Sequence, residues 1–253
     1  MSDSVRDERF PGFGGASLAL HRLGTGRPVI LLHGLFSDAQ TNWIKFGHAA
    51  QLAEAGFEAL MPDLRAHGDS AAPHEPSAYP PDVLALDLQA LVAHLGLTHF
   101  DLCGFSLGAR TAVRAVLAGL APRRLVLGGM GLEGLTGWGD RRSFFLDVIA
   151  RYGTIKPGDP AYFAQQFMKS TGVDREAAAL LLGSMENTAP EALAGISMPT
   201  LVVCGSEDDD NGSADRLAET LPNATRETIP GTHMSSVTGK ALGKAIVRWL
   251  AAD

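Results

Sequence analysis

The stretch Gly104-Phe105-Ser106-Leu107-Gly108 decides the fold that we predict for this chain. It fits the pattern Gly-x-Ser-x-Gly, in which a serine occupies a sharp turn between a strand and a helix. Residues 99–103 can form the strand, and residues 109–120 predict the helix. Glycine on both sides leaves room for that helix to pack close to the strand. We therefore expect the Ser106 hydroxyl to project at a helix N-terminus, where backbone amides favour negative charge.

Apolar runs and helical segments alternate on both sides of this motif. The unbroken run at residues 28–32 is typical of a strand covered on both faces, as in a parallel sheet. The alternation predicts an α/β fold with a mostly parallel central sheet, right-handed crossovers and helices on both faces. The predicted strands are residues 17–23, 28–32, 57–61, 99–103, 123–130, 199–204 and 224–229. The helices predicted beside them are residues 39–55, 82–95, 109–120, 213–221 and 236–251.

A long helical segment interrupts this alternation. No strand is apparent between residues 133 and 197. We predict that this segment is a helical cap inserted between two strands, and that residues 1–132 and 198–253 form the core domain. The helices predicted in the cap are residues 140–152, 160–170 and 175–185, with a shorter one near residue 191.

Composition and charge narrow the classes of function. The chain has 253 residues, 45% hydrophobic residues and a formal net charge of −7. This charge disfavours nucleic acid and anionic membranes as partners. A membrane helix needs about 20 apolar residues, and no apolar run in the sequence is nearly that long. Residues 1–10 are predicted to be a solvated tail without the apolar region of a secretory signal, so a cytoplasmic location is expected. Cys103 and Cys204 fall in predicted strands and are interpreted as core residues, not as a disulfide or metal ligands.

Four predicted strand ends carry reactive or polar groups, at the edge of the sheet where such folds form their sites. They are His33-Gly34, Ser106, Asp208 and His233. A serine hydroxyl is a poor nucleophile at neutral pH. It needs a base that takes its proton, and the base needs a carboxylate that orients it.

With these motifs the chain strongly resembles the α/β-hydrolase fold family, in its serine esterase-like branch, over nearly its whole length. In that family the nucleophile, acid and histidine follow one another along the chain. The resemblance implies that Ser106 is the nucleophile, Asp208 the acid and His233 the general base. The motifs that carry it are His33-Gly34, Asp63-Leu64-Arg65-Ala66-His67-Gly68-Asp69-Ser70, the Ser106 turn, the turn from Gly205 to Asp208, and Gly231-Thr232-His233.

The resemblance also implies an oxyanion hole made by the backbone N–H groups of Leu35 and Leu107. No metal or organic cofactor is implied. His33 is interpreted as a residue that stabilises the turn below the site. The charged turn around Asp63, Arg65 and His67 is interpreted as structural.

The identity of the acid stays open because four acidic residues, 207–210, adjoin one another. The family's Gly-x-x-Asp turn favours Asp208, followed by Asp209. Glu133, just beyond a predicted strand, is a distant alternative.

Apolar residues near these positions are candidates for a substrate pocket, because ligand pockets are mostly apolar. No charged residue stands out as a partner for a substrate carboxylate or phosphate. The candidates are Phe36, Met130, Trp138, Phe144, Phe163 and Met234.

We therefore expect a serine hydrolase, a carboxylesterase that cleaves small esters with short or medium acyl chains through an acyl-enzyme on Ser106. A serine nucleophile disfavours the dehalogenase and epoxide-hydrolase branches, which use an aspartate. Hydrolysis of carbon–carbon bonds, lactones or thioesters and acyl transfer remain open. A low-turnover receptor or scaffold is an alternative of another class. The oligomeric state is open.

Overall fold

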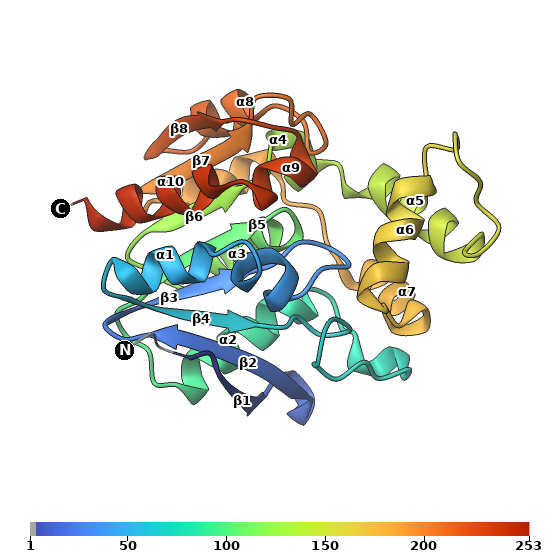
Figure 1. Ribbon diagram of the computed structural model, residues 1–253, viewed down its shortest axis with the longest axis horizontal. Coiled ribbons are helices and arrows are strands. Elements are labelled where there is room, and N and C mark those ends of the chain that lie inside the picture. The colour runs from blue at the N-terminus through green and yellow to red at the C-terminus, as the bar shows by residue number, and fades with distance from the viewer. Residues whose placement is uncertain (1–3, 253) are drawn as a thin grey trace.

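A computed structural model describes residues 4–252 of the chain (Figure 1). Its centre is an eight-stranded sheet in the order β1-β2-β4-β3-β5-β6-β7-β8. β1 (Arg6–Pro11) pairs antiparallel with β2 (Ser17–Gly24), which pairs antiparallel with β4 (Phe57–Pro62). All other pairs are parallel, so the predicted α/β fold with a mostly parallel sheet is confirmed. The remaining strands are β3 (Arg27–Leu32), β5 (Asp101–Phe105), β6 (Leu125–Gly128), β7 (Thr200–Gly205) and β8 (Ala224–Ile229).

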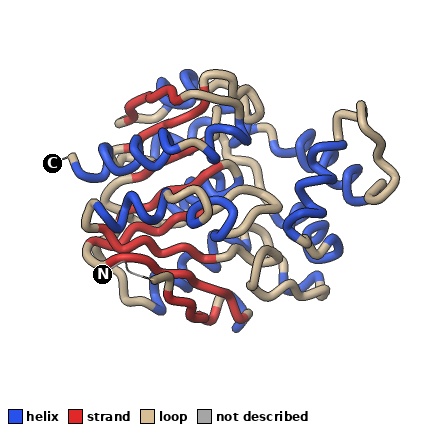
Figure 2. The backbone as a smooth tube through the Cα atoms, viewed as in Figure 1, coloured by secondary structure: helices blue, strands red, loops and turns tan. Residues whose placement is uncertain are grey.

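Helices cover both faces of the sheet (Figure 2). Alternate residues of β3 point to opposite faces, as in any strand: Ile30 and Leu32 join one core cluster, and Val29 and Leu31 join the other. The first cluster includes α2 (Val83–His94), α3 (Leu107–Leu117) and α8 (Ala214–Thr220). The second includes α1 (His48–Glu54) and α10 (Lys240–Ala251). No helix of residues 4–252 is long and apolar enough to cross a membrane.

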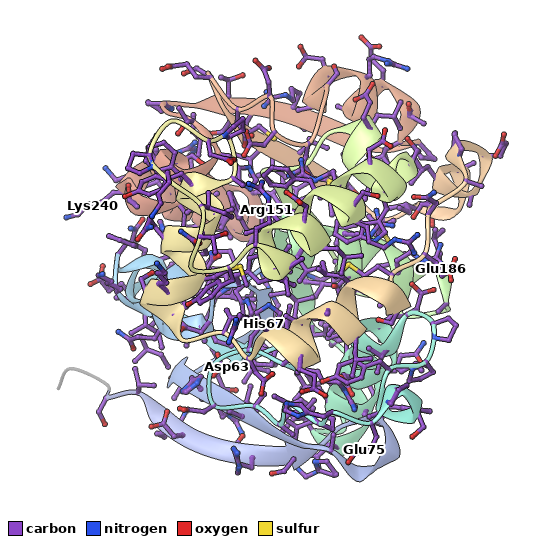
Figure 3. All side chains as sticks on the ribbon, turned by 90° about the vertical axis from the view of Figure 1, so that its right-hand side faces the viewer. Asp63, His67, Glu75, Arg151, Glu186 and Lys240 are labelled. Carbon is purple, nitrogen blue, oxygen red and sulfur yellow. The ribbon has the colours of Figure 1, made fainter. Side chains whose placement is uncertain are left out.

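The chain between β6 and β7 is helical, and α5, α6 and α7 lie beside the carboxyl ends of the parallel strands (Figure 1). Figure 3 looks onto this side of the molecule, where Arg151 follows α5. Phe36, from the loop after β3, joins the apolar cluster of these helices and meets Phe145 edge-on, with ring centroids 5.5 Å apart. The helices are α4 (Leu132–Thr136), α5 (Trp138–Ala150), α6 (Tyr162–Thr171) and α7 (Arg175–Ser184), followed by a 3-10 helix, Pro190–Gly195.

The predicted solvated tail is wrong for residues 6–10, because they belong to β1, an edge strand of the sheet; residues 1–3 lie outside the described residues. Its charged side chains are exposed, but they pair with groups on neighbouring strands and loops. Arg6 pairs with Glu58 at 3.1 Å, and Glu8 with Arg22 at 3.0 Å. A run of charges is interpreted as a solvated tail when the partners of those charges are distant in the sequence.

Two predicted helices are interrupted at glycine. In place of one helix over residues 39–55, a π-helix (Gln40–Ile44) is followed by α1, with Gly47 in the left-handed region at φ 82°. The helix predicted over residues 236–251 is two helices, α9 (His233–Thr238) and α10, which meet at Gly239. The spacing of apolar residues indicates which face of a helix is buried. It does not show where the helix is interrupted.

Arg65 is a buried cation that links the end of β4 to α2. Its side chain is 2% exposed and forms two parallel hydrogen bonds to Asp87, at 2.9 and 2.7 Å. The guanidinium also donates to the carbonyls of Ala78 and Phe13. Every side of this charge therefore meets an acceptor, which is the condition under which a buried ion pair is tolerated.

Removing one member of this pair is expected to be strongly destabilising, because the other charge stays buried without a partner. Arg65→Ala should lower the free energy of unfolding by about 3–5 kcal/mol. Arg248→Ala, which removes the exposed ion pair with Glu227, is the matched control and should cost at most about 1 kcal/mol. Urea denaturation measures both, and equal losses would contradict the special role of the buried pair.

Candidate active site

Ser106 lies on the turn between β5 and α3, with a positive φ of 53° that is unusual for a residue with a side chain. A Cβ at residue 104 would lie 2.2 Å from the backbone of Gly108, and one at residue 108 would lie 2.1 Å from the carbonyl oxygen of Leu32. Only glycine fits at either position. The turn thus holds Ser106 in a strained conformation at the first turn of α3.

His233 is the first residue of α9, which follows β8, and Asp208 lies in the loop after β7. Both residues are 8% exposed, and His233 Nδ1 lies 3.0 and 3.1 Å from the two carboxylate oxygens of Asp208. A carboxylate accepts hydrogen bonds, so the ring proton is assigned to Nδ1, which leaves Nε2 as an acceptor. The ring also packs against Phe105, the neighbour of Ser106, with centroids 5.0 Å apart.

The other two acid candidates are placed differently. Asp209 is exposed and has no recorded hydrogen bond to His233 within residues 4–252. The carboxylate of Glu133 accepts from the N–H of Ser213 at 2.8 Å and pairs with Arg216. Asp208 is therefore the candidate that the structure brings to His233.

Asn211 contacts the Ser106 hydroxyl and was not singled out by the sequence. Its Nδ2 lies 2.7 Å from the carbonyl oxygen of Gly129 and 3.5 Å from Ser106 Oγ. Within residues 4–252, Ser106 Oγ makes this long contact and no hydrogen bond to His233. The hydrogen bond between a catalytic base and its nucleophile is often long until a substrate binds. The only sequence signal for Asn211 is its place three residues after Asp208.

The loop after β3 carries a backbone N–H, that of Leu35, without an acceptor among residues 4–252, and Leu35 lines the same cavity as Ser106. Gly34 donates to Asn42 Oδ1 at 3.0 Å, and its carbonyl accepts from Ser37. In the described part of the chain, no acceptor is recorded for the N–H of Leu35 or for that of Leu107, the first residue of α3. These are the two amides named from the sequence. Asn42, which the sequence analysis missed, is 3% exposed, and its Nδ2 has no partner among residues 4–252.

Two buried histidines hold this loop. His67 Nε2 accepts from the N–H of Phe36 at 3.0 Å, and His33 Nε2 accepts from the N–H of Leu64 at 2.9 Å. Burial lowers the pKa of His33 and lowers the pKa of His67 to about 3. Both rings are thus neutral, and each uses both nitrogens on the backbone, which agrees with a structural role for the turn.

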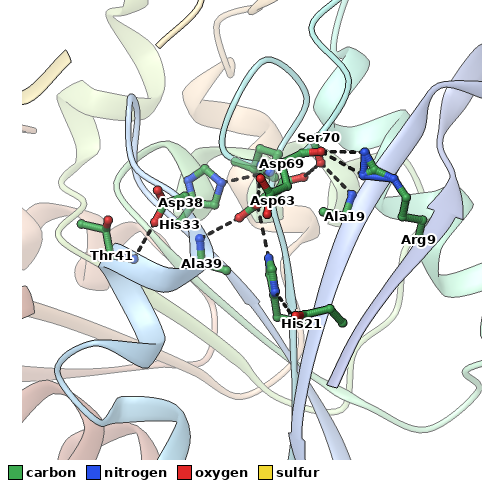
Figure 4. Close-up of polar contacts among 12 residues, drawn as sticks. Arg9, Ala19, His21, His33, Asp38, Ala39, Thr41, Asp63, Asp69 and Ser70 are labelled. Carbon is green, nitrogen blue, oxygen red and sulfur yellow. Dashed lines mark hydrogen bonds and ion pairs between the residues drawn. The ribbon is translucent and has the colours of Figure 1, made fainter. Parts of the chain in front are cut away.

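Asp63 organises the base of the same turn (Figure 4). Its carboxylate accepts from the N–H groups of Ala39 and Asp69 and contacts His21 Nε2 at 3.3 Å. The hydrogen bond to Asp63, with a second to Asp7, raises the pKa of His21 to about 9. Burial alone would raise the pKa of Asp63, but His21 and the backbone donors lower it to about 2. The grouping of His21, Asp63 and Asp69 resembles a metal-ligand set, but both oxygens of Asp63 already accept from N–H donors.

A cavity of about 1350 Å³ opens over Ser106 and is lined by the sheet edge and by α5 and α6. His233, Leu35 and Leu107 also line it. Phe163 and Met234, which are 81% and 53% exposed, place large apolar side chains at the solvent-exposed edge of the cavity. All six apolar pocket candidates line this cavity: Phe36, Met130, Trp138, Phe144, Phe163 and Met234.

Fold and site together define a hydrolase-type sheet with a serine on its sharp turn. Residues 29–240 match the model of the alpha/beta hydrolase family, and the chain belongs to this family. It is 30% identical to a non-heme haloperoxidase of Rhodococcus erythropolis, over 82% of this chain and 85% of that protein.

Two further comparisons show how far the likeness extends. Epoxide hydrolase 2 of Siraitia grosvenorii is 34% identical over 39% of this chain, and the match spans only 30% of that protein. An esterase from Exiguobacterium antarcticum superposes with a TM-score of 0.79, at 18% identity, over 96% of this chain and 99% of that one. At this identity the structural likeness concerns the fold.

His67 and His21 should shape opposite arms of the pH–stability profile. The folded-state pKa of His67 lies below the unfolded value of 6.5, so stability should fall as the pH drops from 6.5 toward 3, by about 2 kcal/mol at pH 5. The folded-state pKa of His21 lies above 6.5, so its contribution should be complete below that pH and lost as the pH rises through 9.

Urea unfolding between pH 5 and 9 measures both arms. His67→Gln keeps an acceptor for the N–H of Phe36 but does not titrate, so it should flatten the acid arm; His21→Asn should flatten the basic arm. Variants with the same pH dependence as the wild type would refute the assignment.

Proposed function

We propose that this protein is a serine hydrolase that cleaves carboxylic esters through an acyl-enzyme on Ser106. One observation carries the proposal. His233, oriented by Asp208 with Nε2 left as an acceptor, lines the same cavity as a strained serine. Leu35 and Leu107 line it too, and their backbone N–H groups have no acceptor among residues 4–252. A base, a nucleophile and oxyanion donors in one place are the parts that acyl transfer requires.

In the proposed mechanism, His233 Nε2 takes the hydroxyl proton while Ser106 Oγ attacks the ester carbonyl carbon. The N–H groups of Leu35 and Leu107 stabilise the resulting oxyanion. The leaving alcohol takes the proton from His233, and the acyl group stays on Ser106. Water then attacks the acyl-enzyme and gives a proton to His233. His233 passes this proton to Ser106 Oγ as the acyl–Oγ bond breaks, which releases the acid and restores the serine hydroxyl. Asp208 stays ionised and stabilises the imidazolium in both halves.

The side chain at the turn favours this reaction over those named for some relatives. Epoxide hydrolases of this fold are expected to use an aspartate nucleophile, whereas this chain has a serine at the turn. An acyl-serine is formed most directly from an ester. The relatives bear several names, so the names alone do not choose among esters, lactones, thioesters and carbon–carbon bonds. The cavity exceeds the usual range of about 300–1,000 Å³, so we propose that bulky acyl or alcohol groups are accepted.

We also propose that residues 133–197 act as a cap over this cavity. α5 and α6 contribute Trp138, Phe144 and Phe163 to its lining, which supports a role in substrate selection.

Ser106→Ala should abolish hydrolysis of nitrophenyl esters, with a loss of kcat of at least about 10⁴-fold and an unchanged far-ultraviolet circular dichroism spectrum. A fluorophosphonate should label the wild type on Ser106 and leave the variant unlabelled, as intact-mass spectrometry would show. Ester turnover that survives the substitution would overturn the nucleophile. Labelling of the wild type without turnover of any ester would favour the receptor alternative.

Asp208→Asn should lower kcat about 10³- to 10⁴-fold, because an amide does not hold the histidine in the required tautomer. Asp209→Asn, next in the chain and exposed, is the matched control and should change kcat less than about threefold. Steady-state kinetics on one nitrophenyl ester compares them. The reverse order of effects would assign the acid to the neighbouring residue.

A further inference from the structure

Arg141, in the first turn of α5, contributes a guanidinium to the cavity over Ser106. The side chain is half-buried and donates from Nη1 to the carbonyl oxygen of Asp210. No Asp or Glu within residues 4–252 lies within ion-pair distance of it. A guanidinium carries five N–H donors, so most of its hydrogen-bonding capacity has no recorded partner in the protein.

A second arginine that lines the same cavity, Arg110, has protein acceptors for its guanidinium N–H groups. Arg110 donates to the carbonyl oxygens of Gly134, Leu135 and Glu186, and it is 3% exposed. Arg141 lacks such a set of acceptors. Its guanidinium carbon lies 5.7 Å from the centroid of the Phe145 ring, a cation–π contact that uses none of the N–H donors. The acceptors for these donors must therefore come from solvent or from a ligand in the cavity.

The acidic groups nearest to Arg141 leave its charge available. Asp208 is bound to His233, and the side chains of Asp140 and Asp210 at the cavity are exposed, where solvent and salt screen them. Burial lowers the pKa of Arg141, whereas Asp210 and Asp208 raise it. The guanidinium stays protonated at neutral pH in any case.

Arg141 is also close enough to Ser106 for one small molecule to reach both. It binds the carbonyl of Asp210, and the next residue, Asn211, contacts Ser106 Oγ. Because these two residues are consecutive, covalent bond lengths limit the distance from Arg141 Nη1 to Ser106 Oγ to less than about 14 Å. That distance is spanned by a substrate of moderate chain length.

We propose that Arg141 forms an anion subsite, so that the enzyme's substrates are esters that carry a carboxylate away from the scissile bond. The inference rests on the proposed function and adds the class of substrate to it. A planar guanidinium binds a carboxylate through two parallel hydrogen bonds, which would fix the far end of the substrate while the ester carbonyl meets Ser106. The carboxylate can belong to the acyl chain or to the alcohol.

Two pairs of esters test the subsite from the two sides of the scissile bond. The acyl pair compares mono-4-nitrophenyl esters of the five- to eight-carbon dicarboxylic acids with 4-nitrophenyl esters of the monocarboxylic acids of equal length. The alcohol pair compares 3-acetoxybenzoate with phenyl acetate. In at least one pair, kcat/KM should favour the carboxylate ester by about 10- to 100-fold, the usual effect of a charge-assisted hydrogen bond.

Arg141→Gln, which removes the charge and keeps a polar side chain, should reduce this preference about tenfold or more. The readout is the ratio between two esters within one variant, so a general loss of activity cancels. Arg142→Gln is the matched control, because Arg142 is adjacent, exposed and absent from the cavity lining. A preference that is missing in both pairs, or equal in wild type and Arg141→Gln, would overturn the subsite.

Binding of adipate, measured by calorimetry, tests the subsite without turnover. Adipate should bind the wild type and Arg142→Gln equally, and Arg141→Gln about tenfold more weakly. Hydrolysis of neutral esters without this difference would refute the subsite alone. Absence of all ester hydrolysis, with adipate binding that depends on Arg141, would refute the proposed function and leave the subsite intact. If Arg141→Gln does not fold, the wild type alone tests the subsite. The subsite would be refuted if adipate neither binds the wild type nor inhibits its hydrolysis of a neutral ester.

Discussion

The close approach of α3 to the sheet is the constraint on which the rest of the structure depends. Gly104 and Gly108 allow it, because any side chain at either position would overlap backbone atoms of the helix or of β3. The approach forces Ser106 into a positive φ and presents its hydroxyl above the sheet edge. A turn of this kind stores strain, and the buried strands β3, β5 and β6 around it supply the packing that maintains it.

The order of the strands then brings distant loops to the same edge. β5 lies between β3 and β6, and β7 and β8 follow on one side, so the loops that carry Leu35, Asn211 and His233 surround Ser106. Asn211 ties the loop after β7 to the carbonyl of Gly129, after β6. Hydrogen bonds between the side chains of one loop and the backbone of its neighbour hold the arrangement.

Polar groups below the site are neutralised or paired, which separates their role from that of the cavity. His33 and His67 are uncharged and spend both ring nitrogens on backbone groups, and Arg65 is enclosed by acceptors. In contrast, Arg141 lines the cavity and has N–H donors without a protein acceptor among residues 4–252. The difference between satisfied and unsatisfied polar groups is what distinguishes a scaffold from a binding surface.

The sequence by itself determined the class of fold, the family and the chain order of the serine, aspartate and histidine. Those features rest on local signals: glycine spacing at a turn, apolar runs for buried strands, and short motifs at strand ends. It misread residues 6–10 and the breaks at Gly47 and Gly239, and it passed over Asn42, Asn211 and Arg141. Only the tertiary structure decided which carboxylate meets His233, and which donors face the cavity without a partner. These depend on contacts between residues up to about a hundred positions apart, such as Asn211 and Ser106, and a hydrogen bond is set by distance and angle in space, which no local pattern records.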